Sequence, residues 1–233
     1  MGLCHRWRCN CCDTYSTLVF IAILNFRRAY RIPLEQRYIL NDVIVDCMVR
    51  KDGFRKFIQK KTYLFFRPPS NEDLFDNQLT SIELDYANLE YYSPDSQVID
   101  VERTSEFLFK VFWEPKAGEI AMGVPYTHEF SCLYPRQKIN ASDVNFITFA
   151  TSCYVRNTRI RVSSERDIVK AVAYRKRFGQ SLKRADSIAE FASKVTRPLA
   201  PPPTLISKNE IEWRHDDIRA GEIYYIVTFY ASN

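Results

Sequence analysis

The sequence predicts a mainly β protein, an antiparallel β-sandwich that carries a short helical insert. Runs of aromatic and β-branched residues recur along most of the chain, separated by turn-forming residues, which is typical of strands in a sandwich. The segment 113–120, Trp-Glu-Pro-Lys-Ala-Gly-Glu-Ile, is echoed by the segment 213–223, which also begins at a Trp and ends in Ala-Gly-Glu-Ile. Helical periodicity is confined to residues 164–196.

Each copy of this echo predicts a β-hairpin, because an apolar run, a polar turn and a second apolar run follow one another. Gly118 and Gly221 supply the backbone conformations that tight turns need. The final run, residues 223–230, has too many apolar residues for one solvated face, so we expect a central strand buried on both sides. Most of the large aromatic residues of the two copies should be buried in one sandwich: Trp113, Trp213, Tyr224 and Tyr225.

A second hairpin is predicted near the start of the sandwich. Asp52-Gly53 lies between two apolar runs, and this dipeptide favours the tight turn that joins two antiparallel strands. Strands over 36–50 and 54–66 should therefore pair with each other. Further strands are expected, in chain order, within 79–92, 107–113, 119–124, 126–134, 144–151 and 153–162.

The helical insert is expected at about 164–196. Ser164 with Asp167 resembles a capping box, and the apolar residues from Ile168 to Ala173 have a spacing compatible with an amphipathic helix. Residues 181–194 repeat the helical spacing more clearly. The proline-rich segment 197–203 must be an extended connector, because proline interrupts both helix and central strand.

The N-terminus divides into two predicted segments that precede the sandwich domain of residues 32–233. Residues 1–14 form a Cys-rich head that we expect to be flexible and outside the fold. Residues 15–31 form an apolar segment flanked by Arg27, Arg28 and Arg31, shorter than the roughly 20 residues that a spanning helix needs. This segment is either a buried strand or short helix, or an anchor at a membrane surface.

The seven cysteines do not resemble a secreted disulfide framework. Four crowd the head, whereas Cys47, Cys132 and Cys153 stand alone inside predicted strands, so a reducing, cytoplasmic location is expected. Zinc-ligand chemistry in the head is one alternative, and lipidation at Gly2 or Cys4 is a second, although Arg6 stands where myristoylation favours Ser or Thr. A reduced, disordered tail is the third. No cofactor is predicted, and the metal candidates are Cys4, Cys9, Cys11 and Cys12.

Charge is unevenly distributed along the chain. Residues 67–106 hold two basic and ten acidic residues, whereas residues 153–197 hold twelve basic and four acidic ones. The basic stretch would attract a phosphate-bearing partner such as a nucleotide, a nucleic acid or an anionic lipid, unless it is a solvated face balanced by the acidic stretch. The candidate anion-binding residues are Arg156, Arg159, Arg161, Arg175, Lys176, Arg177, Lys183 and Arg184.

Two resemblances accompany these patterns. The segment Ile218-Arg-Ala-Gly-Glu-Ile-Tyr224 resembles the turn and strand of fibronectin type III and immunoglobulin-like sandwiches, in which the Tyr hydroxyl bonds to the backbone and locks a corner. Residues 38–42, 50–53 and 112–119 resemble a β-sandwich module of bacterial signalling and defence systems. Such modules are usually fused to, or encoded beside, an effector, which implies a sensing or docking role and no catalytic residue.

Catalytic motifs are not evident. The chain has three histidines, and none belongs to a nucleophile motif, a phosphate loop or a dinucleotide-binding fingerprint. We therefore expect a non-enzymatic binding module that docks a partner protein or senses an anionic ligand, associated with a membrane if the apolar segment is an anchor. The alternative is a membrane-associated nucleotide or nucleic-acid sensor that uses the basic residues, and a hydrolase is the third hypothesis.

Overall fold

The computed structural model describes residues 10–30, 32–33, 35–52, 54–67, 75–80, 90–105, 108–115, 120–134, 144–177 and 201–231. These residues form one helix and thirteen strands, so the predicted mainly β, sandwich-like fold is confirmed. The chain divides into two compact units, Met1–Arg37 and Tyr38–Asn233.

The first unit contains helix α1, Asn10–Tyr30. The amide of Ile32 donates to the carbonyl of Arg27 at 2.8 Å, which closes the C-terminal end of the helix. The predicted apolar segment is therefore helical. The helix begins before residue 15, so it also includes the last residues of the predicted flexible head, and residues 1–9 lie outside the described part of the chain.

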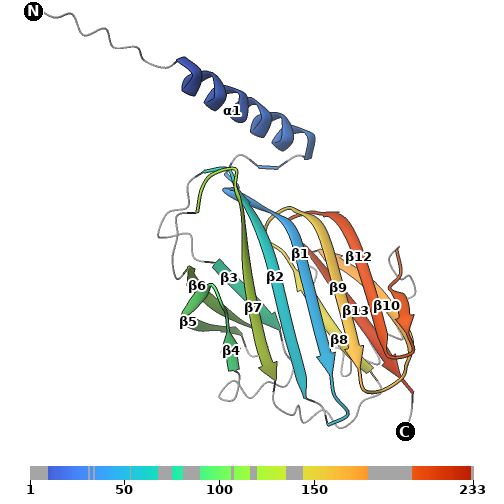
Figure 1. Cartoon of the computed structure of the whole chain (residues 1–233). Helices are drawn as coiled ribbons and strands as arrows, with labels where there is room; N and C mark the ends of the chain where they lie inside the picture. Colours follow the sequence, from blue (N-terminus) through green and yellow to red (C-terminus); the bar gives the residue numbers. More distant parts are fainter. Residues whose placement is uncertain are drawn as a thin grey trace, which may run out of the picture. The chain divides into compact units, whose positions relative to one another are not determined.

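The second unit is built on a seven-stranded sheet (Figure 1). Its order is β11-β12-β9-β1-β2-β7-β4. All neighbouring pairs are antiparallel except β1 and β9, which are parallel, so the sheet is mixed where we predicted an antiparallel one. The predicted hairpin at Asp52-Gly53 is confirmed by the pairing of β1 with β2. The strands are β1 (Tyr38–Val49), β2 (Arg55–Phe65), β4 (Glu90–Tyr92), β7 (Pro125–Tyr134), β9 (Val155–Ser164), β11 (Thr204–Ser207) and β12 (Glu210–Ile218).

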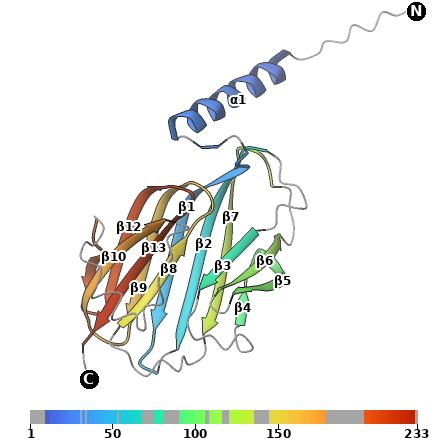
Figure 2. The ribbon, with the colours of Figure 1, turned by 180° about the vertical axis from the view of Figure 1, so that it is seen from behind.

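Two smaller sheets complete the sandwich, and Figure 2 shows them from the other side. One has the order β10-β13-β8 and consists of β8 (Val144–Ala150), β10 (Ile168–Arg177) and β13 (Glu222–Tyr230). The other has the order β3-β6-β5 and consists of β3 (Phe75–Thr80), β5 (Ser96–Ser105) and β6 (Leu108–Pro115). All pairs within both sheets are antiparallel.

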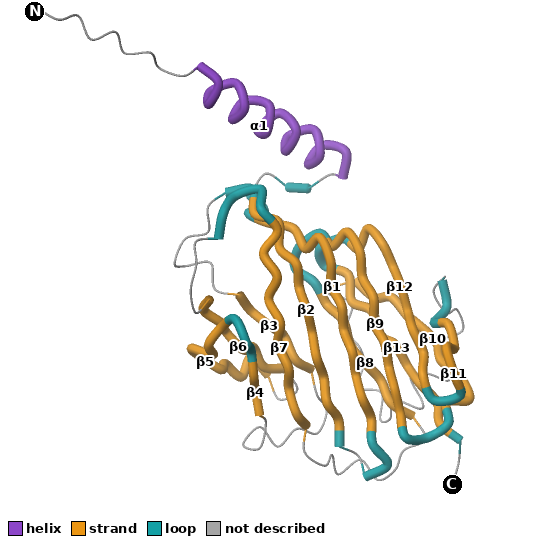
Figure 3. Tube along the Cα trace, in the orientation of Figure 1, coloured by secondary structure: helices purple, strands orange, loops and turns teal. Residues whose placement is uncertain are grey.

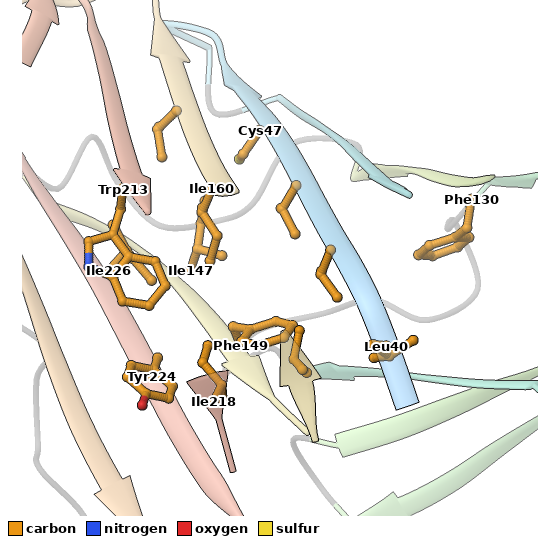
Figure 4. Packing of buried hydrophobic residues seen from close by; sticks show 14 of the residues in the cluster. Leu40, Cys47, Phe130, Ile147, Phe149, Ile160, Trp213, Ile218, Tyr224 and Ile226 are labelled. Atoms are coloured by element: carbon orange, nitrogen blue, oxygen red, sulfur yellow. The ribbon is translucent and has the colours of Figure 1, made fainter. Parts of the chain in front are cut away.

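One hydrophobic core joins the three sheets. The seven-stranded sheet contributes alternate residues of β1, β9 and β12, and β13 faces them with Tyr224 and Ile226 (Figure 4). Trp113 of β6 and Trp213 of β12 are each 1% exposed and belong to the same cluster, as does Tyr224. The predicted burial of the echoed aromatic residues in one sandwich is confirmed for these three, and Tyr225 packs half-buried in a second cluster on the other face of β13.

The predicted hairpins of the two echoed segments are wrong, because both connections cross between sheets. β6 pairs with β3 and β5 while β7 pairs with β2 and β4, and β12 pairs with β11 and β9 while β13 pairs with β10 and β8. The reason is burial: β13 is apolar on both faces and needs a central position, which the place beside β12 does not offer. Residues 120–124, part of a predicted strand, form a turn with Gly123 at a φ of 74°.

The predicted helical insert is wrong over residues 168–177, which form β10. The spacing from Ile168 to Ala173 also satisfies the two-residue period of a strand. Ala173 faces the main core, whereas Val172 and Tyr174 belong to the second cluster on the other face. The clearer helical pattern at 181–194 lies outside the described residues.

Candidate functional site

The predicted anion-binding arginines of β9 lie on the outer face of the seven-stranded sheet. Arg159 and Arg161 alternate there with buried residues of the core. Arg161 forms ion pairs with Glu210 and Glu212, both at 3.2 Å. Glu212 also accepts a hydrogen bond from Arg214 at 2.6 Å. Neighbouring carboxylates of β12 therefore neutralise part of the positive charge that the sequence places on this face.

The remaining basic candidates are not gathered beside these two. Arg156 is exposed on β9, whereas Arg175 belongs to β10 in a different sheet, where its Nη1 lies 3.4 Å from Oε1 of Glu222. Lys176 and Arg177 end β10, and the structure describes their backbone only. Lys183 and Arg184 lie outside the described residues. Anion binding by this set stays a prediction.

The cysteine candidates divide in a similar way. Cys4 and Cys9 lie outside the described residues, and Cys11 and Cys12 lie in the first turns of α1. In the part of the chain that the structure describes, no group of three or more His, Cys, Asp or Glu side chains could hold a metal ion. Cys47, Cys132 and Cys153 are free and buried, and burial raises the pKa of Cys47 to about 11. The Cys47 thiol therefore stays protonated and unreactive at neutral pH.

Sequence reasoning missed a buried polar cluster where β5 approaches β7. His128 of β7 is 1% exposed, and its Nδ1 lies 3.1 Å from Oδ1 of Asp95 and 3.0 Å from Oγ of Ser96. Ser93 donates to the same Asp95 oxygen at 2.7 Å. The amide of Glu129 donates to the other Asp95 oxygen at 3.3 Å. Serine and aspartate side chains of the Ser93–Ser96 turn thus converge on one imidazole nitrogen.

Electrostatics keep the two ionisable groups of this cluster in fixed states at neutral pH. Burial lowers the pKa of His128 and outweighs the opposing effect of Asp95, so the imidazole is neutral. Burial alone would raise the pKa of Asp95, but the hydrogen bond from Ser93, the charge interaction with His128 and the Glu129 amide together lower it, so the carboxyl is ionised. Because Ser96 and Asp95 both contact Nδ1, the imidazole cannot relay a proton between them as a catalytic triad requires. The cluster is suited to holding the turn against β7.

A second buried polar group lies where the chain crosses from β12 to β13. Glu222 accepts hydrogen bonds from the hydroxyl of Tyr224 at 2.8 Å and from the amide of Arg219 at 3.2 Å. Burial, together with the hydrogen bond to Glu222, raises the pKa of the Tyr224 hydroxyl. The resemblance to fibronectin-like sandwiches implies a bond from this hydroxyl to the backbone, and the structure instead directs it to a carboxylate two residues earlier.

The most exposed apolar residues of the sandwich include two on the edge strand β11, a segment that the sequence analysis assigned to no element. All four residues of β11 are exposed, with Leu205 at 56% and Ile206 at 54%. β11 is the edge strand of the seven-stranded sheet, and Figure 3 labels it on the trace. Among the described residues, β12 is the only strand that pairs with β11, so its other side presents free backbone positions. The signal was present in the sequence, because Lys208-Asn209 separates two short apolar runs.

The β11–β12 hairpin is held firmly on the sandwich. The indole Nε1 of Trp213 donates to the carbonyl of Pro201 at 3.2 Å. The amides of Ser164 and Ile168 donate to the carbonyls of Asn209 and Lys208 at 2.9 and 2.6 Å. These bonds fix both ends of β11, so its outer edge is presented in a defined, extended conformation.

Comparisons with known proteins do not assign the chain. No protein-family model matches it, and no curated protein does. Among solved structures, it is similar to a candidate protease from Parabacteroides distasonis, with 8% identity over 84% of this chain and a TM-score of 0.48. It is also similar to leukotriene A4 hydrolase from Saccharomyces cerevisiae (8% identity, 82% of this chain, TM-score 0.40) and to an M1 zinc metallopeptidase from Deinococcus radiodurans (9% identity, 83% of this chain, TM-score 0.36).

The chain spans less than half of each of these proteins: 41%, 29% and 42% of their lengths. At this identity and TM-score, the similarity identifies neither a family nor an activity. It also lends no direct support to the resemblance to immunoglobulin-like and fibronectin-like sandwiches, or to modules of bacterial signalling and defence systems.

Proposed function

We propose that the protein is a non-enzymatic β-sandwich module that docks a partner protein along the edge strand β11. The observation that carries this proposal is the exposure of Leu205 and Ile206 on an edge strand whose outer side is unpaired within the described part of the chain. Proteins usually protect such edges with charge, proline or a bulge, because a free edge is a template for another strand. β11 itself contains no charged residue and no proline, although its register shifts between Leu205 and Ser207.

Strand addition explains both features of this edge. In that mode of recognition, an extended segment of the partner forms main-chain hydrogen bonds with the edge, and alternate side chains supply specificity. Leu205 pairs with Ile211 of β12, and the register shifts between Leu205 and Ser207, so Ile206 lies at an irregularity of the strand. A partner strand would contact these two exposed aliphatic residues at that irregularity. The bonds that fix Pro201 and Lys208 preorganise the strand, which reduces the entropy lost on binding.

The test is photocrosslinking in cells that produce the full chain. A photoreactive amino acid replaces Ile206 in one variant and Met48 in a control variant, because Met48 is also exposed but lies on the outer face of β1. We expect covalent adducts of defined mass from position 206 and none of the same mass from position 48. Adducts from both positions, or from neither, would contradict docking at this edge.

A membrane-surface location is the second proposal, supported by helix α1. Leu18, Phe20, Ile21 and Leu24 are exposed, and at about 100° per residue they fall on one side of the helix. Arg28 is exposed in its last turn, where a cation favours both the helix dipole and anionic headgroups, whereas Arg27 is buried and donates to the carbonyl of Gln36. No helix in the described part of the chain is long and apolar enough to cross a bilayer. We therefore propose that α1 lies in the plane of the interface, on the cytoplasmic side.

Co-sedimentation of the full chain with vesicles tests this location. Phe20→Glu combined with Ile21→Glu should abolish binding to vesicles that contain phosphatidylserine, because both apolar contacts are replaced by charges repelled from the surface. Ala22→Glu combined with Ala29→Glu is the matched control, since it adds the same charge at exposed positions outside the arc of the four apolar side chains and removes no large apolar side chain. Equal loss in the two variants would indicate a purely electrostatic attraction and would contradict apolar insertion.

A further inference from the structure

Two polar side chains at the end of the sandwich where β2 and β8 begin have hydrogen-bonding groups that are buried and unused. Asn145 of β8 is 2% exposed, and neither its amide nitrogen nor its amide oxygen has a hydrogen-bond partner in the described part of the chain. The guanidinium Nε of Arg55 in β2 is likewise buried without a partner among the described residues. Buried polar groups are nearly always hydrogen-bonded, so these two are candidates for binding a ligand.

The strand registers direct both side chains toward the interior. Asn145 lies two residues before Ile147, a core residue on the same side of β8. Arg55 is paired with Val49 of β1, which also belongs to the core, and residues directly opposite one another share a face of the sheet. Arg55 is half-buried and therefore reaches solvent, whereas Asn145 is closed off from it.

Tyr230 of β13 connects these two side chains. Thr228 is paired with Asn145 across β8 and β13, and the Thr228 hydroxyl donates to the Tyr230 oxygen at 3.2 Å. Burial raises the pKa of Tyr230, and the charge of Arg55 opposes this rise, so the guanidinium lies near the hydroxyl. The Tyr230 hydroxyl stays protonated at neutral pH and can act as a donor.

The positive charge of Arg55 is not neutralised by a neighbouring carboxylate. Arg161 on the outer face forms two ion pairs with β12, whereas Arg55 forms none within the part of the chain that the structure describes. The guanidinium of Arg166 lies 5.2 Å from the centroid of the Tyr230 ring and adds a second positive charge. Partial burial of an unpaired charge is unfavourable, and a bound anion would remove that cost.

We infer that Arg55, Tyr230 and Asn145 form a binding site for a small oxyanion that also carries a hydroxyl group. The Arg55 guanidinium neutralises the charge of the ligand, and the Tyr230 hydroxyl and the Asn145 amide nitrogen donate to its oxygens. The Asn145 amide oxygen can only accept, so it selects a ligand with a hydroxyl hydrogen. Hydrogen phosphate and small hydroxycarboxylates have this chemistry. The site uses none of the residues of β11, so the inference goes beyond edge docking and does not depend on it.

Calorimetric titration of the full chain with two pairs of anions tests the ligand class at neutral pH. Inorganic phosphate and sulfate have the same shape, but only phosphate keeps a hydroxyl hydrogen. Glycolate and acetate also differ in one hydroxyl group. We expect a preference of about tenfold for the hydroxyl-bearing member, as one hydrogen bond to a buried group can supply. Preference within the first pair identifies hydrogen phosphate as the ligand, and preference within the second identifies a hydroxycarboxylate. Absence of binding, or equal binding within both pairs, would overturn the inference.

Three variants locate the binding of the preferred anion. Arg55→Gln should weaken it by about tenfold or more, because a charge-assisted hydrogen bond is lost. Arg159→Gln is the matched control, since Arg159 is also half-buried in the same sheet but lies on its outer face, and it should bind normally. Asn145→Leu should stay folded, because an apolar side chain of similar shape replaces an unpaired amide, and it should lose the preference for a hydroxyl group. Equal losses in the two arginine variants would indicate general electrostatic attraction and would contradict a site at Arg55.

Nuclear magnetic resonance of the unmodified chain gives a local measurement that needs no variant. The side-chain amide signals of Asn145 should shift during the titration and saturate with the dissociation constant that calorimetry gives. If calorimetry detects binding but these signals do not move, the anion binds elsewhere and the inference is wrong. Docking at β11 would be unaffected by that result, because crosslinking at position 206 tests it separately.

Discussion

The two echoed tryptophans have matching aromatic surroundings. Trp113 of β6 lies with its ring centroid 5.2 Å from that of His128 and 5.0 Å from that of Phe130. Trp213 of β12 lies 5.5 Å from His215 and 5.3 Å from Tyr224. The similarity in sequence is thus accompanied by a similarity in packing, since each Trp contacts one imidazole and one six-membered aromatic ring.

The two histidines differ in what surrounds them. His128 is buried and its Nδ1 contacts the carboxylate of Asp95. His215 is half-buried, and its Nδ1 lies 2.7 Å from the carbonyl of Asp216, the next residue of β12. Each Trp is therefore paired with an imidazole, but the imidazole of His128 lies in the core and the imidazole of His215 is half-buried. We expect the packing around Trp113 and the packing around Trp213 to contribute equally to stability. The buried imidazole of His128 should in addition make stability dependent on pH.

The largest expected effect is the loss of either indole. Trp113→Ala and Trp213→Ala should each lower the free energy of unfolding by about 3–5 kcal/mol, because each leaves a large cavity in a closed core. Chemical denaturation followed by circular dichroism measures both. A folded variant whose stability differs from that of the unmodified chain by less than about 1 kcal/mol would show that its Trp is not part of the common core.

Glu222→Gln should have the next largest effect. The substitution keeps the shape but weakens the hydrogen bonds from Tyr224 and Arg219, so we expect a loss of about 1–3 kcal/mol. Tyr224→Phe is the companion variant, and the double variant should lose less than the sum of the two single losses because they share one bond. Strict additivity would mean that the bond between the two side chains contributes nothing measurable.

Local patterns in the sequence predicted the local structure well. The Asp52-Gly53 turn, the strands beside it and the burial of Trp113 and Trp213 all follow from periodicity and turn chemistry over a few residues. The sequence patterns did not predict which sheet each strand joins, because an Ala-Gly-Glu-Ile turn is compatible both with a hairpin and with a connection between two sheets. The choice depends on distant strands, since β8 and β10 provide the two neighbours that the apolar strand β13 requires.

The candidate sites show the same limit. Asp95 lies in the turn-forming run Ser93-Pro-Asp-Ser, and its contact with His128 arises only because β5 and β7 approach each other in the fold. Arg161 was expected on a basic face, and its neutralisation depends on the pairing of β9 with β12, two strands that are separated in the sequence by β10 and β11. Spacing along one strand carries no information about which strand lies beside it.

The pH dependence of stability is the third prediction and concerns the two histidines directly. The pKa of His128 is lowered in the folded state, so below the ordinary value near 6.5 the unfolded chain binds more protons than the folded one. Stability should therefore fall as the pH drops through 6.5 toward the folded pKa. The lowered pKa of Asp95 adds a second loss at more acidic pH, below its ordinary value near 3.8.

His128→Asn checks this prediction through unfolding measured at a series of pH values. The variant should be less stable than the unmodified chain at pH 7, because it disturbs the buried cluster, but its stability should fall less between pH 6.5 and 4.5. His215→Asn at pH 7 should cost less than His128→Asn, since the ring it removes is only half-buried. An unchanged slope in the His128 variant would show that another group controls the acid loss.

The smallest expected effect lies on the outer face of β9, the strand that pairs with the Trp213 strand β12. Arg161 pairs with Glu210 and Glu212, but 43% of its side chain is exposed, so solvent screens both interactions. Arg161→Gln should therefore change the free energy of unfolding by no more than about 0.2–1 kcal/mol, and the change should shrink as salt is added. Denaturation at low and high ionic strength measures it. A loss comparable to that of Trp213→Ala would mean that the outer face is covered in solution, because only a desolvated ion pair could contribute so much.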